Sequence, residues 1–363
     1  MVLFYKDDWD AAKARYRAWW DGEYIGRCGL FVTAPREGID PNEPAPAPPT
    51  DFKARWTDLD YISASNEYRN RRTFFGAEGF PCWHPGYPGH LTMPAFLGCR
   101  VRFDERTAWW EPFLAEDEWR LGEINLHTHG RWWRYALEAL DRQVTESMGK
   151  CIPSIGDLGW CGDTLAGIRG SDRLLVDLLE RPALVRATEE HLMSMWCEVY
   201  DEFYRTLAPA GDSGSTCWFP LWAPGKFFAV QNDFSYMISP GMFREIFLPV
   251  LRRQTDYLDY SVYHVDGVNA FAHVPALCEL PKLQAIQILP GSGKPSPLHY
   301  PEALKAVQAA GKNLHITISR NEVEPALATL SAKGLFIHTS CPTEAEAREL
   351  MTKVRRWSVA ERN

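Results

Sequence analysis

The stretch "NLHITISRNEVEPALATLSAKGLFIHTS", residues 313–340, decides the fold class of this chain. A short run rich in Leu and Ile comes first, an amphipathic segment of helical spacing follows, and a second apolar run closes the stretch after Gly334. Buried strands that alternate with amphipathic helices are typical of a parallel sheet whose faces are covered by the helices. The stretch therefore predicts one β-α-β unit of an α/β protein.

The same rhythm extends through most of the chain. Counting from "CGLFVTAP" gives eight strand candidates, the others being "GFPCW", "KCIPSIGD", "STCWFPLW", "YSVYH", "LQAIQIL", "NLHITIS" and "GLFIHTS". Eight such units predict a (β/α)₈ TIM barrel, one domain over residues 1–363, with inserted loops and an N-terminal helix from Asp8 to Trp20. An open doubly wound sheet is the alternative, although no GxGxxG or GxxxxGK[ST] loop follows any of the strands.

Composition excludes several classes of function. The net charge of −8 and the absence of Lys/Arg-rich runs argue against nucleic acid or an anionic membrane as the main partner. No apolar run is long enough to span a membrane, and the N-terminus does not resemble a signal peptide. Nine cysteines without CxxC pairs then predict a reduced, cytoplasmic protein.

His264 and Asp266 form the most informative pair at a predicted strand end. Alternate residues of a strand share a face, so both side chains can reach one ion. Cys341 follows the last strand, and the three together would leave an open position, as catalytic zinc requires. A hydrogen-bonded pair, or a helix cap formed by Asp266, is the alternative, and Cys341 by itself is more typical of a buried thiol. His338 is a reserve ligand.

Four blocks of sequence resemble the uroporphyrinogen decarboxylase-like superfamily. They are "GDTLAGIRGSDRLLVDLLERPALVRATEEHL", "NDFSYMISPGMFREIFLPVL", "YHVDG" and "FIHTSCPTEAEA", in order from residue 162 onward. The last two fall where the methyltransferase branch of that superfamily carries His-x-Cys-Gly and its last cysteine. The resemblance implies a (β/α)₈ barrel and a metal site. Carried over residue by residue, it implies that the ligands of a zinc ion are His264, Asp266 and Cys341.

The chain also departs from the superfamily at two places. Asp266 replaces a cysteine, and a carboxylate donates less charge than a thiolate, so the resemblance implies a more Lewis-acidic ion. Arg36 stands alone where uroporphyrinogen decarboxylase has an Arg-Gln-Ala-Gly-Arg stretch, which makes binding of a four-carboxylate porphyrinogen doubtful. Methyl transfer in this branch works with a cobalamin protein. No Asp-x-His-x-x-Gly loop occurs here, so a corrinoid would sit on a separate partner.

Other polar and aromatic residues at strand ends are candidates for contact with a substrate. The predicted substrate-binding residues are Trp160, Trp218, Trp222, Tyr263, Gln287 and Arg36, and the predicted catalytic residues are Asp163, Asp233 and His84. The tryptophans would suit an aromatic methyl ether or a methylated cation. Each has a structural alternative: packing for the tryptophans, backbone hydrogen bonds for Gln287, helix caps for the aspartates, and a surface loop for His84.

The function predicted from these residues is metal-dependent methyl transfer or demethylation of a small methylated substrate, with a corrinoid protein as methyl carrier. A decarboxylase or lyase acting on a small carboxylated substrate is one alternative, and a non-catalytic binding subunit is another. A homodimer is compatible with either alternative and with the main prediction.

Overall fold

The computed structural model describes residues 3–86, 90–114, 119–159 and 161–362. Its strands are β1 Gly29–Pro35, β2 Thr73–Ala77, β3 Cys82–Trp83, β4 Arg100–Phe103, β5 Ala108–Glu111, β6 Ile152–Pro153, β7 Phe227–Gln231, β8 Tyr260–Asp266, β9 Ala285–Leu289, β10 Asn313–Thr317 and β11 Leu335–Ser340.

The α-helices carry most of the remaining chain. They are α1 Trp9–Trp20, α2 Phe52–Thr57, α3 Leu59–Arg72, α4 Met93–Phe96, α5 Arg131–Ser147, α6 Cys161–Arg169, α7 Ser171–Glu180, α8 Pro182–Leu207, α9 Pro240–Met242, α10 Leu248–Tyr257, α11 Val274–Cys278, α12 Pro301–Ala309, α13 Val323–Thr329 and α14 Glu344–Trp357. Short 3₁₀ turns are η1 Leu121–Glu123, η2 Asp233–Met237, η4 Val268–His273, η5 Pro297–His299 and η6 Arg320–Glu322, and η3 Phe243–Phe247 is a π-helix.

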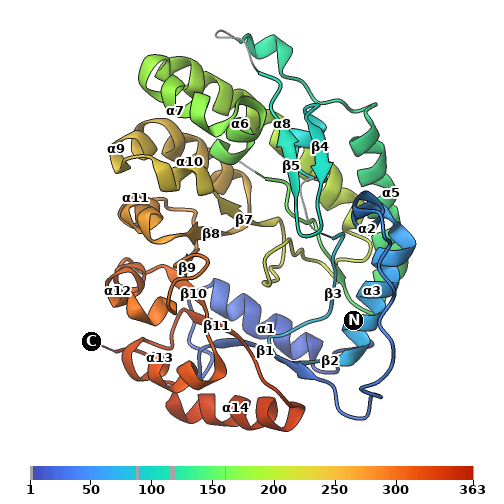
Figure 1. Cartoon of the computed structure of the whole chain (residues 1–363). Coiled ribbons are helices and arrows are strands. Elements are labelled where there is room, and N and C mark those ends of the chain that lie inside the picture. Colours follow the sequence, from blue (N-terminus) through green and yellow to red (C-terminus); the bar gives the residue numbers. More distant parts are fainter. Residues whose placement is uncertain (1–2, 87–89, 115–118, 160, 363) are drawn as a thin grey trace.

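The central sheet has seven strands in the order β2-β1-β11-β10-β9-β8-β7. All its pairings are parallel except that of β2, which runs antiparallel to β1. Figure 1 shows β7 to β11 in succession, with α11, α12 and α13 outside them and β3, α3 and α5 on the opposite side. The prediction of an α/β fold with a central parallel sheet is confirmed.

The predicted closure into an eight-stranded barrel is not found among the described residues, because the sheet is open at both edges. On one side, β2 occupies the edge of β1 that β3 would need. On the other, β3 pairs only with β6, in a separate two-stranded sheet. The predicted strand "STCWFPLW" was also wrong: it contributes isolated bridges at Ser215 and Thr216, and the strand of this region is β7. Pro220 and Pro224 lack the N–H groups that a ladder requires.

The pattern of "SPGMFREIFLPVLRRQTDYLDY", residues 239–260, predicts one long helix with a serine cap, and the chain is helical there as far as Tyr257, with a change of winding in the middle. The Ser239 hydroxyl accepts a hydrogen bond from the Met242 N–H and starts α9, as its position predicted. Pro249 has no N–H to donate back along the helix, and the residues just before it take the π-helical winding of η3.

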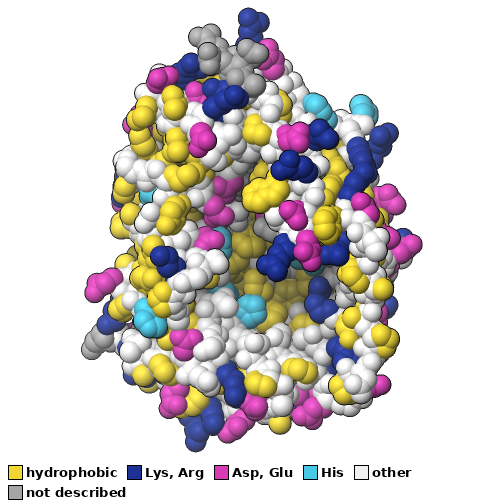
Figure 2. Space-filling model, in the orientation of Figure 1, with side chains coloured by type: hydrophobic (Ala, Val, Ile, Leu, Met, Phe, Trp, Pro, Cys, Tyr) yellow, Lys and Arg dark blue, Asp and Glu magenta, His cyan; other side chains and the backbone are white. Residues whose placement is uncertain are grey.

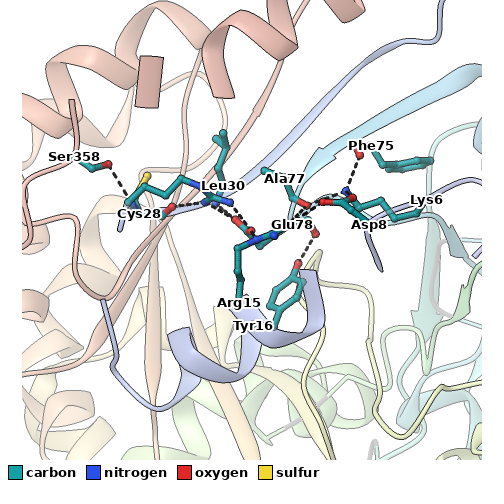
Figure 3. A network of polar contacts seen from close by, with 11 residues as sticks. Lys6, Asp8, Arg15, Tyr16, Cys28, Leu30, Phe75, Ala77, Glu78 and Ser358 are labelled. Carbon is teal, nitrogen blue, oxygen red and sulfur yellow. Dashed lines mark hydrogen bonds and ion pairs between the residues drawn. The ribbon is translucent and has the colours of Figure 1, made fainter. Parts of the chain in front are cut away.

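A buried ionic network anchors the N-terminal helix to the sheet (Figure 3). Glu78 is 1% exposed and accepts hydrogen bonds from Arg27 at 2.6 and 2.7 Å, from the Leu30 N–H at 2.7 Å, and from Arg15 of α1. Burial alone would raise the pKa of Glu78, but the two guanidinium groups outweigh it and hold the pKa below its usual range. The carboxylate thus stays charged and ties α1 to β1.

Candidate functional site

The candidate site is a hollow at the carboxyl ends of the parallel strands. Figure 2 shows it in the middle of the visible face, with hydrophobic side chains in its floor and acidic and histidine side chains along its wall. Ligands of open α/β sheets bind beyond the carboxyl ends of the strands, where the loops diverge. The strand ends of β7, β8 and β9 meet here, since these strands are neighbours in the sheet.

A row of polar side chains crosses four neighbouring strands below this hollow. The register aligns Gln231 of β7 with His264 of β8, His264 with Gln287 of β9, and Gln287 with His315 of β10. Residues aligned across parallel strands share one face of the sheet. These four polar side chains therefore form one band across the sheet.

Gln287 determines which nitrogen of His264 carries a proton. The His264 Nδ1 is hydrogen-bonded to the Gln287 Oε1, and an amide oxygen only accepts, so Nδ1 is the protonated nitrogen. Burial lowers the pKa of His264, against the opposing effects of the Gln287 bond and nearby carboxylates. The imidazole is therefore neutral near pH 7, and its Nε2 keeps a lone pair that can bind a proton, a metal or a substrate.

Asp266 lies next to this lone pair. Its Oδ2 is 3.9 Å from the His264 Nε2, and its Oδ1 has no hydrogen-bond partner. Gly267 follows with φ +92°, a conformation that favours glycine, and a Cβ there would lie 2.6 Å from the Tyr236 ring. Gly267 thus turns the chain directly after the pair and keeps the strand end close to η2.

An acidic cavity of about 460 Å³ opens beside His264. Asp157, Asp163 and Asp233 line it, together with Gln231 and the two tryptophans of the β4–β5 hairpin, Trp109 and Trp110. Asp163 accepts backbone hydrogen bonds from Asp233 at 3.0 Å and Phe234 at 2.7 Å. It therefore holds the start of η2, and it lies within α6 instead of capping the helix after it, which was the alternative that the sequence left open.

The carboxyl groups of this cavity are hard to ionise. Burial raises the pKa of Asp163, and repulsion from Asp233 raises it further, against the two backbone hydrogen bonds. Asp233 is open to solvent at the rim, yet protein surrounds it on the other sides, and its pKa is also raised, by burial and by Asp266 and Asp157. Asp163, being less exposed, is the carboxyl whose shift the geometry supports best.

A second hollow, of about 230 Å³, has aromatic walls formed by Phe31, Phe80, Trp218 and Phe219. Trp218 meets the His264 ring edge-on, with the centroids 5.1 Å apart, so His264 lies close to both hollows. His84 also lines this second hollow. Burial lowers the pKa of His84 to about 4, which leaves it uncharged near pH 7 and makes it a weak base.

The structure brings His264 and Asp266 together but places Cys341 elsewhere. Cys341 follows β11, which is separated from β8 by β9 and β10, and it lines a different cavity with Arg320 and Glu346. Among the residues that the structure describes, no three His, Cys, Asp or Glu side chains are grouped closely enough to hold a metal ion. The predicted metal site therefore has two adjacent donors here, one fewer than catalytic zinc takes from a protein.

The remaining residues that the sequence predicted to contact a substrate have different surroundings. Arg36 donates to the backbone oxygens of Tyr5 and Thr73 in a separate cavity at the N-terminal segment. Trp222 is fully buried 5.5 Å from the ring of Trp9, which is the packing role that the sequence allowed. Strand alternation turns Tyr263 to the opposite face from His264. Trp160 lies outside the described residues.

Gln231 and Asp157 were not identified from the sequence as residues of the site. Gln231 was missed because β7 was placed at "STCWFPLW", whereas "FFAVQ", an apolar run after Gly225, is the strand. That run was the available signal. Trp109 and Trp110, which line the cavity, belong to the antiparallel β4–β5 hairpin, and they were not assigned to the site from the sequence.

Comparison with solved structures gives an informative likeness. No protein-family model and no curated protein sequence matches the chain. The structure is similar to that of a methyltransferase from Methanosarcina mazei, with a TM-score of 0.63 and 12% sequence identity, over 95% of this chain and 98% of that one. At this identity the likeness establishes a shared fold over nearly the whole of both chains. None of the described helices combines the length and apolar character needed to cross a lipid bilayer.

Proposed function

We propose that this protein is a methyltransferase that acts on a small methylated substrate in the hollow beside His264. The observation that carries the proposal is the neutral imidazole of His264, whose Nδ1 is bonded to Gln287 and whose Nε2 is left beside Asp266. The fold shared with a methyltransferase supports the reaction class. The acidic hollow is lined by Gln231, the register neighbour of His264, and the aromatic hollow by Trp218, which contacts the His264 ring. Two such hollows near His264 support a small-molecule substrate.

In this reaction His264 acts as a general base. Its Nε2 takes the proton from the thiol or hydroxyl of the acceptor while that sulfur or oxygen forms a bond to the methyl carbon. The bond from the methyl group to the donor heteroatom breaks, and the donor leaves with the electron pair. The imidazolium that results is stabilised by Asp266, 3.9 Å away, while Gln287 keeps the ring oriented.

Zinc and a separate corrinoid protein remain predictions within this proposal. His264 and Asp266 would be two protein ligands of a zinc ion, which would polarise the acceptor heteroatom. The described side chains supply no third ligand beside them, so no step above depends on the metal. Zinc content per chain, measured on purified wild-type protein and on Asp266→Asn, tests this part separately from turnover.

A small carboxylated substrate, as a decarboxylase would bind, fits the acidic cavity poorly. Three carboxylates line that cavity, and its described lining residues include no Lys, Arg or His to attract an anion. A non-catalytic binding subunit would bind ligand in the same hollow but would give no product in a turnover assay.

The test is transfer of an isotopically labelled methyl group from methylcobalamin, or from a panel of methylated amines and ethers, to thiol acceptors. His264→Gln should lower the rate about 10²–10⁴-fold, the range that positioned acid–base groups contribute. His299→Gln is the matched control, because His299 is exposed on η5 and lines neither hollow. Equal rates for His264→Gln and wild type would refute the role of His264, and no transfer by wild type from any donor would refute the proposed function.

A further inference from the structure

The acidic cavity beside His264 contains three carboxyl groups and no cationic side chain in its described lining. Asp157, Asp163 and Asp233 line it, and none of its described lining residues is Lys, Arg or His. The ion pairs found among the described residues involve none of these three aspartates, although such pairs are numerous elsewhere on the molecule, for example between Arg244 and Glu279. Three carboxylates that share one concave space without a cation favour a positively charged ligand.

Aromatic side chains also line this cavity. Trp109 and Trp110 of the β4–β5 hairpin and Phe234 of η2 line the same cavity. Indole rings attract cations through the negative face of the π-system, and they do so best when the cation is large and weakly hydrated. Carboxylates and aromatic rings together are therefore suited to an alkylated ammonium group more than to a small inorganic ion.

An unpartnered buried hydroxyl points to a ligand independently of the charge. Thr164 of α6 lines this cavity and is 2% exposed, and its Oγ1 has no hydrogen-bond partner. Buried polar groups nearly always have a partner, so an isolated one in a residue that lines a cavity favours a ligand that would supply the contact once the Thr164 side chain turns toward it. A metal ion does not meet this need, since the described residues offer no group of three metal-binding side chains.

We propose that this cavity binds a small organic cation that carries an N-methylated ammonium group. The carboxylates would neutralise the charge, the tryptophans would contact the methyl groups, and Thr164 would be covered by the ligand. Gln231 lines the cavity and is in register with His264, so a methyl group at this end of the cavity would approach the proposed base. The inference rests on the proposed function only for the fate of the methyl group, since binding can be measured without turnover.

Cation binding should also be linked to pH. In the free protein the pKa of Asp163 is raised by burial and by repulsion from Asp233, and the pKa of Asp233 is raised by burial and by repulsion from Asp266 and Asp157. A bound cation stabilises the ionised carboxylates, so binding releases protons and becomes tighter as pH rises. A neutral ligand of the same shape lacks this dependence.

The experiment is calorimetric titration of the full-length wild-type chain with choline and with 3,3-dimethylbutan-1-ol, which replaces the ammonium nitrogen by carbon. Choline should bind at least about tenfold more tightly than its neutral isostere, with affinity that rises with pH. Equal binding of the two, or tighter binding of the isostere, would overturn the inference and would need no variant.

Variants then locate the site. Asp233→Asn should weaken choline binding about tenfold and leave binding of the isostere unchanged, and Trp110→Leu should weaken choline binding as well. Asp141→Asn on α5, an exposed aspartate, is the charge-matched control and should bind choline as wild type does. Choline affinity unchanged in both Asp233→Asn and Asp157→Asn would overturn the inference.

The outcomes separate the two proposals. Choline binding in this cavity without loss of any methyl group would support the inference and count against methyl transfer. Methyl transfer from neutral ethers, with no preference for choline over its isostere, would support the proposed function and overturn the inference.

Discussion

His315 should make the protein progressively less stable below about pH 6.5, the usual pKa of histidine. It lies on β10, is fully buried, and has no hydrogen-bond partner at either ring nitrogen. Phe219 meets it edge-on with centroids 4.7 Å apart, and Phe336 stacks on it at 5.7 Å. Burial, and then the neighbouring His338 and His264, lower its pKa well below the usual value.

The sign and the magnitude follow from proton linkage. The unfolded chain binds a proton at this position below about pH 6.5, while the folded chain does not, so stability is present above that pH and is lost as pH falls. Between about pH 7.5 and about pH 5.5, this one group should remove about 1.4 kcal/mol from the free energy of unfolding.

The variant His315→Leu isolates the effect. It removes the orphaned nitrogens and also changes packing between the two phenylalanines, so its stability at a single pH is not diagnostic. The packing change is the same at both pH values. Urea unfolding of both proteins at both pH values should therefore show a pH-dependent loss smaller by about 1.4 kcal/mol in the variant. The same loss in the two proteins would show that His315 is protonated in the folded state, and the reasoning from its burial would be wrong.

Three further predictions concern the buried network, the His264 tautomer and the turn after Asp266. Glu78→Gln should lower the free energy of unfolding by about 3–5 kcal/mol, because it leaves Arg27 buried without a countercharge. The control in the same urea titration is Glu245→Gln, which removes an exposed ion pair with Arg186. Equal losses for the two variants would contradict the importance of the buried network. Gln287→Glu should raise the pKa of His264 by about one unit or more, because a carboxylate favours the imidazolium; NMR titration of ¹⁵N-labelled histidine measures it, and an unchanged pKa would contradict the contact between these side chains. Gly267→Ala should lower the free energy of unfolding by about 1–3 kcal/mol more than Gly38→Ala, because both glycines have positive φ but only at position 267 would the added Cβ meet a neighbour, the ring of Tyr236. Similar losses for the two variants in thermal or urea unfolding would contradict the close approach of Tyr236.

The C-terminal half of the fold could be predicted from sequence because its elements are local. The apolar runs of β8, β9, β10 and β11 are bounded by turns and separated by amphipathic helices, and each lies where its run predicted. The N-terminal half could not be predicted in this way. Its strands β3 and β6 have two residues each, and β2 takes the edge of β1 through long-range pairing that no local pattern reports.

The site follows the same division. His264, Asp266 and Gln287 could be placed on one wall because strand alternation and neighbouring strands are readable from sequence. The separation of Cys341 from them could not be foreseen, because it depends on how the open sheet carries β11 away from β8. The grouping of three carboxyl groups without a cation in the described lining of the cavity was equally hidden, since it is a property of the folded surface and not of any motif.

The pairing of β1 with β11 has a consequence for folding of the chain during its synthesis on the ribosome. About 300 residues separate the two strands, and at about 5–20 residues per second β1 must wait about 15–60 s after its own synthesis for β11 to be made. One edge of β1 is covered much sooner, because β2 follows within forty residues. The antiparallel strand β2, which occupies the edge of β1 in the open sheet, thus covers one of the two hydrogen-bonding edges of β1 early in synthesis. Early pairing of β1 with β2 should therefore reduce aggregation through the unpaired edges of β1 during translation.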